Sequence, residues 1–213
     1  MSEPAAPRLV PAAPATAEIR VSNSRFIAHA ASAATVEEAR ACLAAIRAAL
    51  PDATHHVYAY RIGHGATTTE GQSDAGEPSG TAGRPVLAVV RGSGLGDIIV
   101  VVTRYFGGTL LGTGGLVRAY GDAAKAVLAV LPHAEKIDYT RLAITVPYAA
   151  YELSRRHIAA HAGALTHETF AADVSLEVRL PTVQAAPLAD ALREATAGQA
   201  RVETLAPPPA SAV

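Results

Sequence analysis

The chain has 213 residues, a formal net charge of −1 and one cysteine, Cys42. This length suffices for one large or two small domains with buried cores, and the near-neutral charge excludes a global electrostatic attraction to nucleic acid. A single cysteine excludes an internal disulfide and a cysteine-rich zinc site. No apolar run approaches the roughly 18 residues of a membrane-spanning helix, and the N-terminus lacks the apolar segment of a signal peptide. We therefore expect a cytoplasmic protein without membrane contact.

The first third of the chain predicts a tail, a strand and a helix. Residues 1–17 and 207–213 are rich in Ala and Pro, and we expect both to be flexible tails. Residues 20–30 have the composition of a strand with a loop. Thr35 and Glu38 form a capping-box pattern, after which apolar residues recur at helical spacing until Pro51.

The middle third alternates strands with glycine-rich loops. Residues 57–62 have strand composition, and Ile98 to Val102 are five β-branched residues in a row, which indicates a buried central strand. Residues 63–83 are predicted as loop, while 85–90 fit either a helix or a strand. A helix is predicted from Leu116 to Leu131, where Pro132 follows.

The last third has a different texture, because only Gly163 and Gly198 of the 17 glycines lie beyond Tyr139. Its predicted order is strand, helix, hairpin, helix and strand, which is the βαββαβ plan of ferredoxin-like domains. The segments are 142–146, 148–162, 165–170, 174–180, 183–197 and 201–205. We place the domains at 18–136 and 137–206, and the fold class is α+β.

The glycine-rich loop before the helix at Leu116 is the first candidate site. A strand, a glycine loop and a helix start together favour anion binding, because unpaired backbone N–H groups and the helix dipole attract negative charge. No Lys-Ser or Lys-Thr follows the glycines, so the P-loop pattern is incomplete, and no G-x-G-x-x-G opens a helix. The alternative is a loop whose glycines only allow tight packing. The candidate anion or nucleic-acid contacts are Arg104, Gly107, Gly108, Gly112, Gly114, Gly115 and Arg118, with Arg61 and Arg84 converging from other segments.

A second candidate cluster contains Asp74, Glu77 and one residue of the pair His55 and His56. Two carboxylates and a histidine suit general acid–base chemistry, with His56 as the candidate partner. The carboxylates equally suit helix capping or pairing with arginines. Neighbouring histidines on an extended segment point to opposite faces, so only one can enter a given site. We predict no metal site and no cofactor.

Four stretches together resemble the IMPACT/YigZ family over residues 18–131. They are SNSRFIAHA, ATHHVYAY, SDAGEPSGTAGRPVLAVV and VVVTRYFGGTLLGTGGLVRAYGDAAKAVL. The βαββαβ segment resembles the small C-terminal domain of bacterial members. Three positions depart from the family pattern, which are Asn23, Val57 and Ala75, the last standing where a second acid is usual. The matched positions are Arg25, His55, His56, Asp74, Glu77, Thr81, Arg104, Gly107, Gly108, Gly112, Gly114, Gly115 and Arg118.

The resemblance implies both a fold and a function. The first domain would have the ribosomal-protein-S5-domain-2-like fold with a helix at 85–90, and the second would be ferredoxin-like, as in elongation factor G. Family members are linked to translation, and eukaryotic ones act through a ribosome-associated partner. We therefore expect a non-catalytic module that binds RNA, the ribosome or a translation-associated protein. The alternative is a hydrolase of phosphorylated or peptide substrates at the Asp74, Glu77 and His56 cluster.

Overall fold

A computed structural model of the protein describes residues 8–206, apart from the side chain of Ala66. The chain divides into two compact units between Lys136 and Ile137. Each unit has its own hydrophobic core, so the expected α+β architecture with two domains is confirmed. Of the tails expected at 1–17 and 207–213, residues 1–7 and 207–213 lie outside the described residues.

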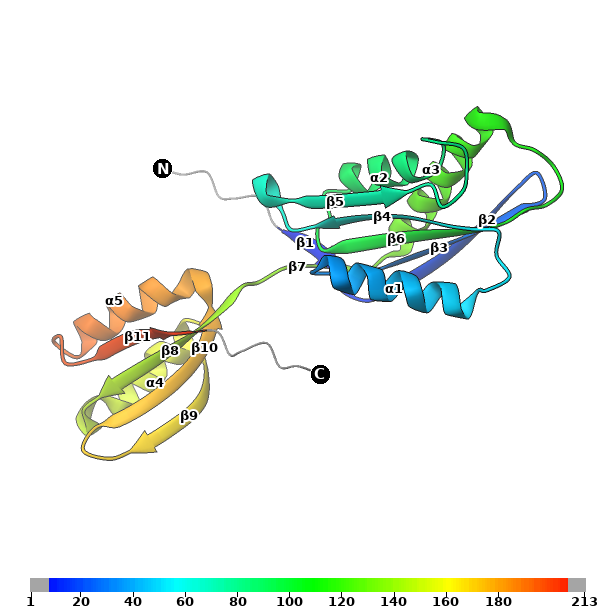
Figure 1. Cartoon of the computed structure of the whole chain (residues 1–213). Helices are drawn as coiled ribbons and strands as arrows, with labels where there is room; N and C mark the ends of the chain where they lie inside the picture. Colours follow the sequence, from blue (N-terminus) through cyan, green and yellow to red (C-terminus); the bar gives the residue numbers. More distant parts are fainter. Residues whose placement is uncertain (1–7, 207–213) are drawn as a thin grey trace. The chain divides into compact units, whose positions relative to one another are not determined.

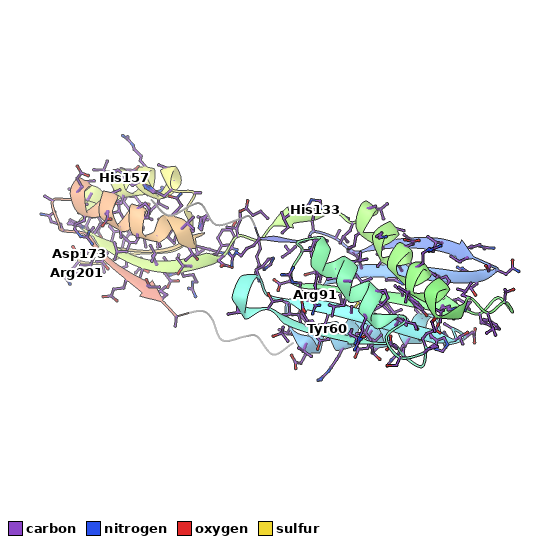
Figure 2. The ribbon with its side chains drawn as sticks, turned by 90° about the horizontal axis from the view of Figure 1, so that it is seen from above. Tyr60, Arg91, His133, His157, Asp173 and Arg201 are labelled. Atoms are coloured by element: carbon purple, nitrogen blue, oxygen red, sulfur yellow. The ribbon has the colours of Figure 1, made fainter. Side chains whose placement is uncertain are left out.

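The first unit is a five-stranded sheet with helices on both faces (Figure 1). All neighbouring strands are antiparallel, in the order β2-β3-β6-β4-β5. Helix α1 covers one face, and helices α2 and α3 lie side by side over the other (Figure 2). The strands are β2 (Ala15–Val21), β3 (Ser24–Ser32), β4 (His55–Ile62), β5 (Thr69–Ser73) and β6 (Ile98–Tyr105), and the helices are α1 (Val36–Ala49), α2 (Gly83–Gly92) and α3 (Gly112–Val130).

The central strand β6 organises both cores of this unit. Its β-branched residues alternate between the two faces, so that Ile99 and Val101 pack under α1 while Val100 and Val102 pack under α2 and α3. This double burial explains why the strand is apolar without alternation. Helix α1 begins as predicted, because the Thr35 hydroxyl accepts a hydrogen bond from the Glu38 backbone N–H at 3.1 Å.

The expectation of a flexible tail over residues 1–17 is wrong for its second half. Strand β1 (Leu9–Pro11) pairs with β7 (His133–Glu135), and β2 already begins at Ala15. Apolar and polar residues do alternate in β2, where Ala15, Ala17 and Ile19 pack against the core while their neighbours face solvent, but the prediction gave more weight to the Ala- and Pro-rich composition. The loop expected at 63–83 likewise contains a 3-10 turn (Gly65–Thr67) and strand β5.

Helix α3 begins at Gly112, four residues before the predicted start. The loop that precedes it passes over the turn between β2 and β3. At Gly107 the backbone approaches so closely that an added Cβ would lie 2.1 Å from the Asn23 carbonyl carbon. The Gly107 N–H donates to the buried Ser24 hydroxyl at 3.2 Å, so this loop is fixed to the sheet.

The second unit is ferredoxin-like. Its antiparallel sheet has the order β11-β8-β10-β9, and two helices cover one face over a core that includes Ile144, Leu176 and Leu188. Its elements are β8 (Tyr139–Val146), α4 (Tyr151–Ala160), β9 (Ala164–Phe170), β10 (Val174–Pro181), α5 (Ala185–Ala195) and β11 (Arg201–Leu205), with 3-10 turns at Tyr148–Ala150 and Thr182–Gln184. In the described part of the chain, no helix combines the length and apolarity that crossing a membrane requires.

The close approach at Gly107 predicts that Gly107→Ala destabilises the first unit. The new methyl group collides with the backbone of the β2–β3 turn, and such overpacking costs roughly 1–3 kcal/mol. Gly114→Ala is the matched control, since an added Cβ there meets nothing within 4 Å and alanine favours a helix. It should raise stability by about 0.5–1 kcal/mol. Urea unfolding followed by circular dichroism measures both changes, and equal stability of the two variants would contradict the packing role.

Candidate functional site: a pocket at the start of helix α3

A pocket of about 440 Å³ lies where β4 begins and β6 ends. Antiparallel pairing sets His55 opposite Arg104, and the loop after β5 brings Glu77 beside them. The start of α3 closes the remaining side. The lining residues are Thr54, His55, Glu77, Pro78, Arg104, Phe106, Leu110, Leu111, Gly112, Thr113 and Leu116. Five of these eleven residues have apolar side chains, and the volume is in the range of ligand pockets.

Arg104 is buried, with only 5 % of its surface exposed. Its Nη1 donates to Glu77 Oε1 at 2.7 Å and its Nη2 to Ser24 Oγ at 3.3 Å. The guanidinium carbon lies 5.4 Å from the ring centre of Phe26 and 5.5 Å from that of Phe106, which is within cation–π range. Its Nε has no hydrogen-bond acceptor among the residues that the structure describes. These contacts therefore hold the Arg104 guanidinium in the interior of the first unit.

Glu77 is the acceptor at the centre of this network. Its Oε1 also receives a hydrogen bond from the Tyr120 hydroxyl at 2.7 Å. Burial, together with the bond to Glu77, raises the pKa of the Tyr120 phenol far above its ordinary value, so Tyr120 remains a donor. The His55 Nδ1–H donates to the Ala75 carbonyl at 2.9 Å, and its Nε2 lies 3.8 Å from Glu77 Oε1. Ala75 thus takes part in this network through its backbone carbonyl.

Asp74 has a structural role. Its carboxylate accepts hydrogen bonds from the backbone N–H groups of Gly80, Ala82 and Gly83, at 2.8, 3.0 and 2.8 Å. These donors lead into α2, which has no capping side chain of its own, so Asp74 caps the helix from the preceding loop. Burial raises the pKa of Asp74, but the three N–H donors and nearby Arg84 outweigh it and hold the pKa below its usual value.

The candidate cluster of His56, Asp74 and Glu77 does not assemble. The His56 side chain lies on the α1 face of the sheet, with Nδ1 3.1 Å from Thr103 Oγ1, whereas Glu77 lies on the opposite face. Burial and the charge of Arg47 lower the pKa of His56 there. His55 is the histidine beside Glu77. The alternation argument limited the site to one histidine, but the assignment to His56 was wrong.

Of the arginines proposed to converge on the glycine loop, Arg61 lies at the opposite end of the sheet. It pairs with Ile98, six positions before Arg104 along β6, which corresponds to roughly 20 Å. It donates to the Leu95 carbonyl and lies 3.6 Å from Glu70. Arg84 is exposed at the start of α2 beside Gly80, and Arg118 is exposed on α3; neither lines the pocket.

The candidate glycines have different structural roles. Gly107 allows the close approach to the β2–β3 turn, while Gly108 and Gly112 adopt positive φ angles of 82° and 68°. Gly114 lies in the first turn of α3 facing open space, and an added Cβ at Gly115 would lie 3.0 Å from the Leu111 side chain. The loop is thus shaped by its packing, and it leaves one helix start open to the pocket.

Sequence reasoning missed the apolar part of this site. Leu110 and Leu111 belong to the glycine loop together with Phe106, but the prediction considered the glycines and arginines of the loop and left these leucines out. A run of apolar residues inside a loop of small residues is the signal that identifies them, because such residues are expected to be buried or to bind. Within residues 8–206 no group of three or more His, Cys, Asp or Glu side chains is placed to hold a metal ion.

Comparisons with known proteins match both units. A family model described as the Impact N-terminal domain matches residues 22–128, and one described as a domain of unknown function, DUF1949, matches residues 144–199. "IMPACT family member YigZ" of Escherichia coli (strain K12) is 39% identical over 191 residues, covering 89% of this chain and 94% of that protein. "IMPACT family member in pol 5'region" of Thermus thermophilus is 42% identical over 186 residues, covering 86% and 99%.

A solved structure supports the fold. A crystal structure described as that of a hypothetical protein is 37% identical and covers 93% of this chain and 97% of its own, with a TM-score of 0.68.

The capping role of Asp74 predicts a pH-dependent stability difference. Because its folded-state pKa is depressed, its contribution is complete above the unfolded value near 3.9 and is lost as the pH falls through the folded value. Asp74→Asn should therefore cost about 1 kcal/mol at pH 7, and the difference from wild type should shrink below about pH 4. Thermal unfolding at several pH values measures this. The exposed Asp122→Asn serves as control, and a constant difference at every pH would contradict the assignment.

The buried pair predicts that Glu77→Ala is among the most damaging substitutions in the first unit. It leaves the Arg104 charge buried without its carboxylate, which costs about 3–5 kcal/mol. Tyr120→Phe removes one hydrogen bond to Glu77 and should cost about 1 kcal/mol. Glu135→Gln, on an exposed strand of the same unit, should change stability by less than about 0.5 kcal/mol. Urea unfolding compares the three, and a small effect of Glu77→Ala would rule out the central role of the pair.

Proposed function

The chain belongs to the IMPACT family, and we propose that it is a cytoplasmic, non-catalytic module that regulates translation by binding a translation-associated protein on the ribosome. The translational role rests on membership of this family, whose model and relatives match the chain and whose members are linked to translation. The observation that carries the choice of a protein partner is the apolar surface around the pocket. Leu110 is 87% exposed, Phe106 47% and Val117 43%, and clustered exposed apolar side chains of this kind mark interaction surfaces.

Direct RNA binding at the glycine loop receives less support from the geometry. Arg104, the arginine nearest to the loop, is buried and paired with Glu77, so a phosphate cannot take its guanidinium without breaking that pair. Arg84 and Arg118 are exposed but do not line the pocket, and Arg61 is at the opposite end of the sheet. Nucleic-acid binding depends on several phosphate contacts together, and neither exposed arginine lines the pocket.

A hydrolase also receives less support. Asp74 is engaged by three backbone N–H groups, and Glu77 Oε1 by Arg104 and Tyr120. A general base needs a free acceptor within hydrogen-bond reach of the proton that it removes. His56, the third member of the proposed cluster, faces α1. The remaining group, His55, makes no hydrogen bond to the hydroxyl of Thr54 or Thr113, the two threonines that line the pocket.

Co-sedimentation with ribosomes tests the proposal. Wild-type protein should pellet with ribosomes at low and at physiological salt, because an apolar contact depends little on ionic strength. Leu110→Ser should abolish pelleting at both salts, and Arg118→Ala should leave it nearly unchanged. An RNA contact predicts the reverse, with strong salt dependence and a requirement for Arg118.

The matched control is Leu153→Ser. Leu153 is an exposed leucine on α4 in the other unit, so its replacement makes the same chemical change at a residue that does not line the pocket. If Leu110→Ser and Leu153→Ser reduce pelleting equally, the result argues against the pocket as the docking site. Absence of pelleting at both salts would contradict attachment to the ribosome.

A further inference from the structure

The pocket contains hydrogen-bond donors that lack acceptors. Arg104 lines it, is buried, and has an Nε–H without an acceptor among the described residues. Glu77 Oε1 already receives two hydrogen bonds, from Arg104 Nη1 and from Tyr120. Buried donors in native structures normally have partners. Among the described residues, the Arg104 Nε–H is thus a buried donor that the protein leaves without a partner beside this pocket.

The start of α3 adds further donors on the same side. The residue before the helix, Leu111, has no side chain that can cap it, and the first turn contains no acidic residue. The first N–H groups of a helix have no intrahelical acceptors and carry a partial positive charge. Gly112 and Thr113 of this turn line the pocket, and the Thr113 hydroxyl is one more polar group there. This excess of donors favours a carboxylate.

The side chains around the cavity favour a ligand in which an apolar group is attached to that carboxylate. Phe106, Leu110, Leu111 and Leu116 surround the cavity. Apolar surface also continues outside it at Val117 on α3, so a single small molecule in the pocket leaves part of the surface uncovered. A chain segment with a large apolar residue in the pocket and further contacts beside it covers both.

We propose that the pocket binds a segment of the partner protein in which a leucine or phenylalanine is flanked by aspartate or glutamate. The apolar side chain fills the cavity, and the neighbouring carboxylate meets the open start of α3. This inference rests on the proposed function for the existence of a partner and deepens it by giving the chemistry of the docked segment. Charge complementarity between the acidic residue and the helix start selects the segment over neutral apolar sequences.

Three synthetic peptides test the chemistry directly. All are eight residues long, acetylated and amidated, with Glu-Leu-Phe-Asp, Gln-Leu-Phe-Asn or Glu-Ser-Ser-Asp in the middle. Each is titrated into the ¹⁵N-labelled full chain while the amide resonances of Gly112 and Thr113 are followed. The first peptide should saturate, the neutral one should bind about tenfold more weakly, and the one without apolar residues should not saturate. Equal affinity of the first two peptides would overturn the role of the carboxylate.

A matched pair of variants locates the carboxylate at the helix start. Gly114 lies in the first turn of α3, has no positive φ, and an added Cβ there meets nothing within 4 Å. Gly114→Asp supplies a competing carboxylate and should weaken the acidic peptide about tenfold relative to Gly114→Asn, since like charges repel and the helix start is already satisfied. The neutral peptide should bind the two variants equally. An acidic peptide that does not distinguish them would place its carboxylate elsewhere.

Two further results separate this inference from the proposed function. If the acidic peptide fails to bind while Leu110→Ser still abolishes ribosome pelleting, the acidic segment is wrong and the proposed function stands. If the peptide binds as expected but pelleting does not depend on Leu110, the ligand chemistry stands and the translational role does not. Saturable shifts of Gly112 and Thr113 with a uridylate decamer, but not with the acidic peptide, would overturn the inference in favour of RNA.

Discussion

The buried pair of Arg104 and Glu77 is the interaction on which the first unit depends. It joins the end of β6 to the loop after β5, and through Tyr120 and Ser24 it reaches α3 and the β2–β3 turn. Four segments distant in sequence thus meet at one carboxylate and one guanidinium. A buried ion pair contributes little net stability over apolar packing, but losing one partner is costly. The pair therefore fixes the arrangement of these segments more than it adds to stability.

Because these groups are bound to one another, their pairing determines which ligands the surface beside the pair can bind. Because the most prominent arginine and the two loop carboxylates are used internally, the pocket has few charges left to offer. What remains is an apolar cavity beside an uncapped helix start. Such a surface is poorly suited to acid–base catalysis or to a phosphate backbone, and it is well suited to recognising a side chain of another protein. The chemistry available at the site therefore depends on which charged groups already form hydrogen bonds or ion pairs inside the protein.

The sequence predicted those elements whose local signals agree with their tertiary environment. Five successive β-branched residues identified β6, a capping box identified the start of α1, and the alternation of elements identified the ferredoxin-like unit. Prediction failed where tertiary structure decides. Strand β2 alternates apolar and polar residues, but it begins inside an Ala- and Pro-rich stretch, and β5 lies in a polar, glycine-containing stretch. Which of His55 and His56 faces Glu77, and at which end of the sheet Arg61 lies, depend on strand direction and face, which one strand's sequence does not encode.

The glycine loop shows why a motif that resembles an anion site need not use its charges for anions. Glycine serves at least three needs here, which are a close backbone approach at Gly107, positive φ at Gly108 and Gly112, and an open helix start at Gly114. Only the last bears on a ligand, and a helix start attracts a carboxylate as readily as a phosphate. The apolar residues between the glycines then decide between these anions. Since Phe106, Leu110 and Leu111 surround the N–H groups with apolar surface, an anion that carries its own apolar group fits better than a phosphodiester backbone.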